Sequence, residues 1–149
     1  MTEPEILSAP LVLEFPFSRT TGPVIGAFLT GLREKTVVGM RGADGRVICP
    51  AVEYDPETGA PLTELVELSD TGTVTSWTWV SQPRQGQPFA RPFAFALVQI
   101  DGADTAMAHA VDVADATEMS TGMRVRARWA VEREGLITDI ECFEPELAR

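Results

Sequence analysis

The sequence has little of the chemistry that most enzymes and metal proteins use. Its 149 residues include two cysteines, Cys49 and Cys142, and one histidine, His109. Two thiols cannot form a four-thiolate metal site, and we interpret them as small half-buried thiols that pack like apolar side chains. His109 lies in the run MAHAV, with no serine or carboxylate motif beside it, and the common nucleophile, zinc-protease and dinucleotide motifs are missing. These absences argue against catalysis within this chain.

Basic charge and long apolar runs are also scarce. Twelve Lys and Arg stand against 22 Asp and Glu, for a formal net charge of -10. Such a chain is repelled by phosphate backbones, which makes nucleic-acid binding an unfavoured function. No apolar run reaches the roughly 20 residues of a membrane helix, and the start MTEPEILSAP lacks the basic and apolar parts of a signal peptide. We expect a cytoplasmic protein with no membrane association.

The first apolar pattern with helical spacing covers residues 21–35. Pro23 suits a first helical turn because that position needs no backbone N–H donor. The apolar stripe of the predicted helix contains Val24, Phe28, Leu29 and Leu32. Because such a stripe must pack against something, we predict that Phe28 and Leu32 contact a partner. Residues 1–35 form a predicted N-terminal extension with this helix.

Residues 36–63 contain two short turn motifs, R-x-x-D-G at 41–45 and D-x-x-T-G at 55–59. In each, the final glycine permits a left-handed backbone turn. The runs T-V-V-G-M-R and R-V-I-C-P on either side of Asp44 and Gly45 predict a β-hairpin. The spacing is that of zinc knuckles, although no metal-binding thiol is present in either motif.

Residues 64–149 are dominated by strand patterns. Alternating runs rich in Val, Thr and aromatic residues predict five strands, with a short helical segment, ADATEMS, between the third and the fourth. That order is typical of the OB fold, a small Greek-key barrel. The predicted fold class is mostly β: an N-terminal helix, a degenerate metal-free zinc-ribbon-like segment and a C-terminal five-stranded OB-fold barrel.

Two sets of side chains on the predicted barrel are candidates for contact with a partner. Strict alternation places Trp77 and Trp79 on one strand face, and Arg124, Arg126 and Arg128 on one face of another strand. These residues fit either an ordinary outer barrel face, with the arginines paired to acidic residues, or a binding surface, where Trp and Arg are enriched.

The long loop S-Q-P-R-Q-G-Q-P-F-A-R-P-F is the best candidate for functional contact. Its prolines restrict the backbone, so that ordering the loop on a partner costs less entropy. We predict that Phe89, with Trp77 and Trp79, binds a partner, and that Arg84 and Arg91 contact a CoA phosphate. An ordinary long barrel loop is the alternative.

Four segments in this order resemble a known family. They are T-G-P-V-I-G-A-F-L-T-G-L-R-E, G-x-x-x-x-D-G-R-V, E-L-S-D-T-G-T-V-T-S-W-T and S-T-G-M-R-V-R-A-R-W. The family, long catalogued as a domain of unknown function, consists of acyl-CoA-associated OB-fold proteins with an N-terminal helix and a rubredoxin-like zinc ribbon. The resemblance places the four zinc-ligand positions at Arg41, Asp44, Asp55 and Thr58, where no thiolate remains. We therefore expect no metal, with Arg41 paired to Asp44 or Asp55 instead.

The resemblance implies a partnership rather than an activity. Family members work beside thiolase-superfamily enzymes, including lipid-transfer-type thiolases and aldolases that cleave steroid side chains. The implied function is a non-catalytic accessory subunit in a hetero-oligomer, without a cofactor of its own but sharing an acyl-CoA thioester with its partner. The alternatives are an OB-fold module that binds single-stranded nucleic acid, which would need a basic groove with stacking aromatics, and an enzyme in its own right.

Overall fold

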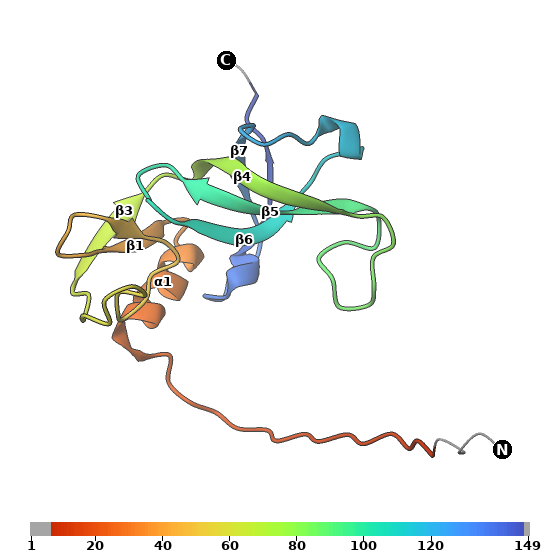
Figure 1. Ribbon diagram of the computed structural model, residues 1–149, viewed down its shortest axis with the longest axis horizontal. Helices are drawn as coiled ribbons and strands as arrows, with labels where there is room; N and C mark the ends of the chain where they lie inside the picture. Colours follow the sequence, from red (N-terminus) through yellow and green to blue (C-terminus); the bar gives the residue numbers. More distant parts are fainter. Residues whose placement is uncertain (1–6, 148–149) are drawn as a thin grey trace, which may run out of the picture.

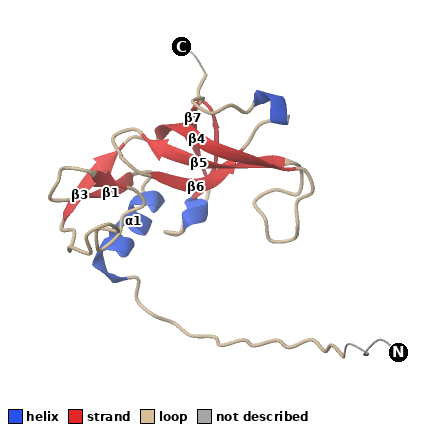
Figure 2. Ribbon diagram, viewed as in Figure 1, coloured by secondary structure: helices blue, strands red, loops and turns tan. Residues whose placement is uncertain are grey.

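The computed structural model describes residues 7–147, and in it one helix and a small sheet adjoin a β-barrel (Figures 1 and 2). Residues 1–6 of the predicted N-terminal extension and residues 148–149 of the predicted barrel segment lie outside this range. Residues 7–20 form an extended arm that leads away from the body to the start of the helix (Figure 1).

Helix α1, Gly22–Arg33, matches the predicted helix to within two residues at each end. Pro23 lies in its first turn, as its missing N–H allows. At the other end, the Lys35 N–H donates to Leu32 O at 3.0 Å, and the Thr36 N–H donates to Gly31 O at 2.8 Å. This is a Schellman ending, with Lys35 in the left-handed conformation at φ 61°. It reverses the chain directly into the first strand.

The small sheet has the strand order β2-β1-β3 and is antiparallel. Its strands are β1 Val37–Arg41, β2 Val47–Ile48 and β3 Glu64–Leu68. The β1–β2 hairpin confirms the pattern around Asp44 and Gly45. Residues 64–68, however, were predicted to begin the first barrel strand, and they pair with β1 instead. The chain changes sheets at Ser69 and Asp70, where the Ser69 hydroxyl accepts from the Thr71 N–H at 3.2 Å.

The barrel confirms the predicted five-stranded OB-type fold. It consists of β4 Thr71–Val80, β5 Phe93–Ile100, β6 Ala106–Val111, β7 Arg124–Trp129 and β8 Ile140–Pro145. The closed order is β4-β5-β6-β8-β7, with β6 and β8 parallel and the other pairs antiparallel. The 3-10 segments are η1 Ala116–Glu118, at the predicted place between the third and fourth strands, and η2 Ile137–Asp139 before β8.

One apolar core joins the helix, the small sheet and the barrel. Phe28 and Leu32 of α1 are 4% and 0% exposed, in the same cluster as Met40 of β1 and Val98 of β5. The prediction that Phe28 and Leu32 contact a partner is therefore corrected: both side chains are buried against the chain's own sheets, and Val24 and Leu29 beside them are partly buried. The predicted segment boundaries at residues 35 and 63 remain predictions.

Within residues 7–147, α1 is too short to cross a membrane, and the structure contains no other helix that could do so.

Candidate functional site

The two turn motifs face each other at the edge of the small sheet. Gly45 and Gly59 have φ of 85° and 70°, the left-handed conformation that the sequence pattern predicts. In the second turn, the Asp55 carboxylate accepts the N–H groups of Glu57 and Thr58 at 2.8 and 2.9 Å. These backbone hydrogen bonds hold the pKa of Asp55 below its usual range.

Arg46 is the cation that connects the two turns. Its Nη1 lies 2.7 Å from Glu57 Oε1, and its Nε lies 3.8 Å from Asp44 Oδ2. The hydrogen bond to Glu57 raises the pKa of Arg46, and the charges of Glu57, Asp44 and Asp55 raise it further. The expected pairing of Arg41 is corrected, because its Nε donates to Glu64 of β3 at 3.1 Å and its Nη1 to Gly45 O at 3.2 Å.

The residues at the four family ligand positions do not fit a zinc ion. Arg41 brings a positive charge, and the Asp55 carboxylate is already occupied by two backbone donors. The Thr58 hydroxyl accepts from the Ala60 N–H at 3.3 Å. Zinc in such ribbons prefers thiolate and imidazole ligands, and residues 7–147 contain no cluster of three or more His, Cys, Asp or Glu side chains that could hold a metal.

The side chains of Trp77 and Trp79 point toward the apolar core rather than to the outer surface of the barrel. Trp77 pairs with Ala96 and Trp79 with Ala94, and both tryptophans pack against the buried core cluster. The register of β4 shifts between Val74 and Ser76, which marks a β-bulge. Both tryptophans share one face, as alternation predicts, but the extra residue reverses the side of every later side chain, so that face is turned toward the core.

The loop between β4 and β5 is attached to the outside of the barrel by Phe89. The Phe89 and Phe93 rings meet edge to face at 5.6 Å, and Phe93 meets Phe95 in the same way at 4.8 Å. With Val80, these aromatics surround the buried side chains of Ala110 and Cys142. Phe89 therefore lies on the opposite side of the sheet from the tryptophans, and the single patch predicted from the sequence divides in two.

The two loop arginines differ in their surroundings. Arg91 lies over the Phe89 ring at 4.9 Å, and its Nη2 contacts Asp112 Oδ1 at 2.6 Å. Burial alone would raise the pKa of Asp112, but hydrogen bonds from Arg91 and Arg128 outweigh it and lower that pKa. Arg84 is exposed, and no ion pair of its side chain is found within the described residues. Arg91 is also exposed, at 53% of its side chain, so both predicted CoA contacts lie at the surface and differ in that only Arg91 is paired within residues 7–147.

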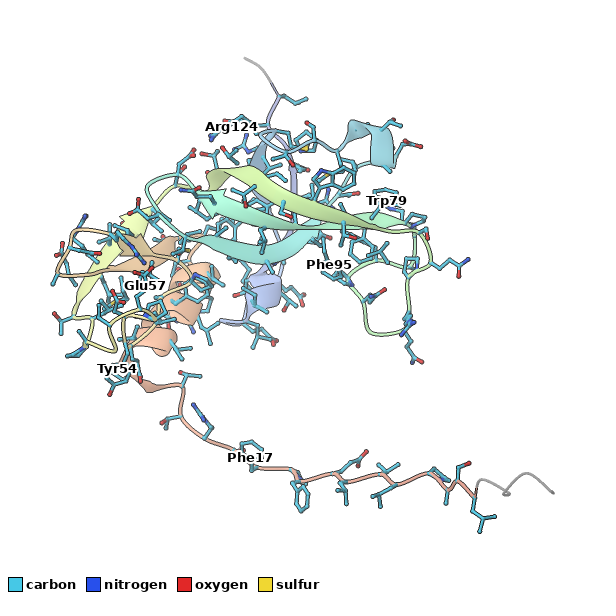
Figure 3. The ribbon with its side chains drawn as sticks, in the orientation of Figure 1. Phe17, Tyr54, Glu57, Trp79, Phe95 and Arg124 are labelled. Atoms are coloured by element: carbon cyan, nitrogen blue, oxygen red, sulfur yellow. The ribbon has the colours of Figure 1, made fainter. Side chains whose placement is uncertain are left out.

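An apolar groove of about 460 Å³ lies between the loop, the outer barrel face and η2. Its walls include Pro88 of the loop, Phe95 of β5, Ala108 of β6 and Ile137 of η2. A smaller hollow of about 250 Å³, beside Thr78 and Leu97, shares Phe95 and Ala108 with it. Figure 3 labels Phe95 beside the loop. This groove could not be predicted from the sequence, because alternation identifies an outward face but not which outward residues remain uncovered.

The outward arginines of β7 are largely neutralised by neighbouring acids. Arg124 makes a bidentate ion pair with Asp101 and a contact of 3.1 Å with Glu146 (Figure 3 labels Arg124). Arg128 contacts Asp112, Glu141 and Glu144 at 2.9, 2.6 and 3.2 Å. Arg124 and Arg128 therefore belong to an ordinary outer barrel face, where arginines are paired with acidic residues. A nucleic-acid groove would need free cations beside stacking aromatics, and here the tryptophans lie on the other face.

The two thiols are buried, whereas His109 is partly buried and lines the groove. The His109 Nδ1 accepts the Ala110 N–H at 2.9 Å, and the ring packs edge-on against Phe143. Burial lowers the pKa of His109, so the ring is neutral at pH 7. Burial also raises the pKa of Cys49 and of Cys142 to about 12, so both remain protonated thiols and poor nucleophiles.

Comparison with known proteins identifies the group to which this arrangement belongs. Residues 65–130 match the family described as "ChsH2, C-terminal OB-fold domain". Over 94 residues, the chain is 31% identical to a "DUF35 domain-containing scaffold protein" of Pyrococcus furiosus, covering 62% of this chain and 68% of that protein. This chain belongs to the DUF35 family.

Two solved structures share the fold of this DUF35 chain. One is a chain of the "Ltp2-ChsH2(DUF35) aldolase", with a TM-score of 0.61 and 21% identity, covering 86% of this chain and 98% of that one. The other is a DUF35 protein of unknown function from Sulfolobus solfataricus, with a TM-score of 0.55 and 20% identity, covering 68% of this chain and 74% of that one. The first similarity includes the helix and the small sheet as well as the barrel, because it extends over most of the chain.

Proposed function

We propose that this DUF35 chain is a non-catalytic accessory subunit that binds and supports a thiolase-superfamily enzyme, a thiolase or an aldolase, acting on acyl-CoA. The observation that carries the proposal is the likeness of nearly the whole chain to one chain of an aldolase whose name combines two proteins. The name "scaffold protein" of the Pyrococcus relative supports the same role.

The chemistry of the described residues supports a role in binding. Both thiols are buried and protonated, and His109 is held between a backbone N–H and an aromatic ring. No nucleophile is activated by a neighbouring base at these three residues. The apolar groove under the loop and the exposed Arg84 are features that recognition needs and that catalysis alone does not.

The proposed substrate is a CoA thioester held jointly with the enzyme. Arg84 lies two residues before Gly86, which lines the groove. One ligand that carries both a phosphate and an apolar group, as an acyl-CoA does, could therefore place the phosphate near Arg84 and the apolar group in the groove. The net charge of -10 favours sharing the CoA phosphates with a second protein. The family resemblance extends the proposal to steroid-derived acyl groups.

Co-expression with a thiolase-superfamily enzyme from the same organism tests the proposal. We expect a co-purifying complex that turns over acyl-CoA thioesters, while the isolated chain turns over none. A panel with steroid-derived and straight-chain acyl groups then identifies the preferred substrate. The proposal fails if the purified enzyme neither binds this chain nor changes its activity when the chain is added.

Turnover by the isolated chain would also contradict the proposal. His109→Ala and Cys49→Ala distinguish a contaminating enzyme from genuine activity, since only the latter depends on residues of this chain. A fluorescence titration with a single-stranded oligonucleotide tests the nucleic-acid alternative, for which we expect no saturable binding at physiological salt.

A further inference from the structure

The barrel has one weak seam, which lies between β6 and β8. The two strands are parallel and share the residue pair Val111 with Phe143, and no further pair of these strands is found in residues 7–147. At this pair, the Asp112 N–H donates to Phe143 O at 2.8 Å. The apolar groove lies over the seam, because residues of both strands line it.

A β-bulge in β8 explains why the pairing is so short. Against β7, Cys142 pairs with Arg128 and Ile140 with Trp129, so Glu141 is an extra residue of β8. A bulge bends its strand and interrupts the ladder of hydrogen bonds. Strand β8 therefore leaves β6 at the point where the next pair would form.

The bulge leaves the Ala110 N–H without an acceptor from a strand. N–H groups of alternate residues point to the same strand edge, so the Ala110 N–H points into the seam as that of Asp112 does. In a regular parallel ladder it would donate to the carbonyl of Glu141, two residues before Phe143. Ala110 is 1% exposed, so bulk water does not replace that acceptor.

The imidazole of His109 supplies the acceptor instead. Its Nδ1 accepts the Ala110 N–H at 2.9 Å, so Nδ1 is unprotonated and the neutral ring carries its proton on Nε2. Nε2 lies 3.5 Å from the carbonyl oxygen of Ile137 in η2, and the ring packs edge-on against Phe143 of β8. One side chain thus connects both strands of the seam with η2, which lies below β6 in Figure 1.

We propose that His109 is a proton-sensitive latch, whose neutral ring closes the seam and whose protonation releases η2 and opens the apolar groove. A proton on Nδ1 would place two donors 2.9 Å apart, so the ring would have to leave the Ala110 N–H. When the ring moves, the contact between Nε2 and Ile137 is lost, and Ile137 is part of the groove wall. The latch goes beyond the accessory role, since it acts in the isolated chain whatever binds in the groove.

The surroundings of the ring favour its neutral form. Strand β5 and loop residues 86–88, which share the groove with His109, carry no charge. On η2, the Asp139 carboxylate accepts the backbone N–H groups of residues 134–136. The titratable side chains of β8 are one protonated thiol and two carboxylates paired with Arg128: Cys142, Glu141 and Glu144. A protonated ring would therefore have no free counter-charge among these neighbours.

These surroundings determine the direction of the response to pH. Burial lowers the pKa of His109 below its ordinary value of about 6.5. With a lowered pKa, the closed seam keeps its full stability above the ordinary value and loses it as the pH falls through the lower one. Between the two values, opening binds one proton and should become about tenfold more frequent per pH unit.

Nuclear magnetic resonance of the isolated full-length chain tests the latch, because His109 is the one histidine of the sequence. At pH 7.5 we expect a proton on Nε2 and none on Nδ1. Between pH 6.5 and 5, the Ala110 amide should lose protection against hydrogen exchange by about tenfold per pH unit, after correction for the intrinsic exchange rate. The amide signal of Ile137 should shift over the same pH interval.

Two variants separate the acceptor from the packing of the ring. His109→Asn places an amide oxygen, which accepts a hydrogen bond but does not titrate, at the position of Nδ1 along the side chain. It should retain the protection of Ala110 and remove its dependence on pH. His109→Phe keeps a ring beside Phe143 without an acceptor, so Ala110 should be poorly protected at every pH.

Each other outcome overturns the latch. A proton on Nδ1 at pH 7.5, or protection of Ala110 that does not change with pH, would mean that the ring does not hold the seam. Equal protection in His109→Asn and His109→Phe would mean that the acceptor is irrelevant, and the wild-type titration decides alone if neither variant folds. A ring that stays neutral until the whole barrel unfolds would make the seam a fixed part of the fold. None of these measurements uses an enzyme or an acyl-CoA, so the accessory role stands whichever result is found.

Discussion

Arg46 and Glu57 join the two turn motifs through an ion pair of 2.7 Å, at the turns where the sequence resemblance implies zinc-ligand positions (Figure 3 labels Glu57). Asp44 and Asp55 add negative charge around the same guanidinium. A small cluster of charges thus connects the two turns without a metal-binding thiolate. The backbone hydrogen bonds of each turn and the apolar core beneath provide the rest of the support.

This arrangement predicts stability that depends on salt and not on metal. Elemental analysis should find no stoichiometric metal, and a chelator should leave the melting temperature unchanged. Arg46→Met should lower the melting temperature slightly at low ionic strength, and the difference should shrink in 1 M salt because exposed pairs are screened. Arg33→Met, which removes another exposed ion pair away from the turns, is the control. One zinc per chain would contradict the prediction.

The core position of α1 predicts that its apolar stripe determines folding rather than partner binding. Leu32→Ala should destabilise the protein by about 2–5 kcal/mol, because a fully buried Leu side chain leaves a cavity. Thr30→Ala, at an exposed position of the same helix, should change stability little. Urea unfolding followed by circular dichroism measures both. A Leu32→Ala variant as stable as the wild type would mean that the helix does not contribute to the core.

The strands and the barrel could be predicted from the sequence because their patterns are local. In β7, Val125 and Ala127 face the core while the intervening arginines face outward, as period-two alternation requires. The faces of Trp77 and Trp79 could not be obtained in this way, since the bulge before them interrupts the alternation. The adjacent polar residues Thr75 and Ser76, between Val74 and Trp77, are the one local sign of it.

Pairing partners are harder to predict than strands, because the choice depends on long-range geometry. Arg41 and Arg46 are five positions apart on one hairpin, and composition gives no reason to prefer either as the cation between the turns. The structure selects Arg46 because β3 brings Glu64 beside Arg41. The groove under the loop has the same origin, since η2 and β6 meet only after the barrel closes.

The ion pair between Arg124 and Asp101 predicts a specific loss of stability in acid. Hydrogen bonds from Arg124 lower the pKa of Asp101 to about 2, below its ordinary value of about 3.9. A lowered pKa contributes stability that is present above the ordinary value and is lost as the pH falls toward 2. Melting temperatures of Asp101→Asn should therefore fall below those of the wild type at pH 6 and approach them at pH 2. Arg124→Met should likewise reduce the change of melting temperature between pH 6 and pH 2. If either variant keeps the wild-type dependence of melting temperature on pH, the pairing is contradicted.

The surroundings of the two loop arginines predict that they affect different measurements. Arg91 is held by Asp112 and Phe89, so Arg91→Ala should lower stability slightly by loosening the loop, while Asp112 stays paired to Arg128. Arg84 is exposed, so Arg84→Ala should leave the melting temperature unchanged.

If the proposed sharing of the CoA thioester is correct, Arg84→Ala should raise the Michaelis constant of the complex for acyl-CoA several-fold with little change in turnover number. The reason is that a phosphate contact far from the reacting carbon stabilises the ground state and the transition state alike. Arg84→Lys should recover part of the effect, since a lysine keeps the charge but not the planar donor pair. Steady-state kinetics of the reconstituted complex decide the matter: an unchanged Michaelis constant for Arg84→Ala, with the complex intact by size-exclusion chromatography, would mean that the CoA phosphates lie entirely on the enzyme.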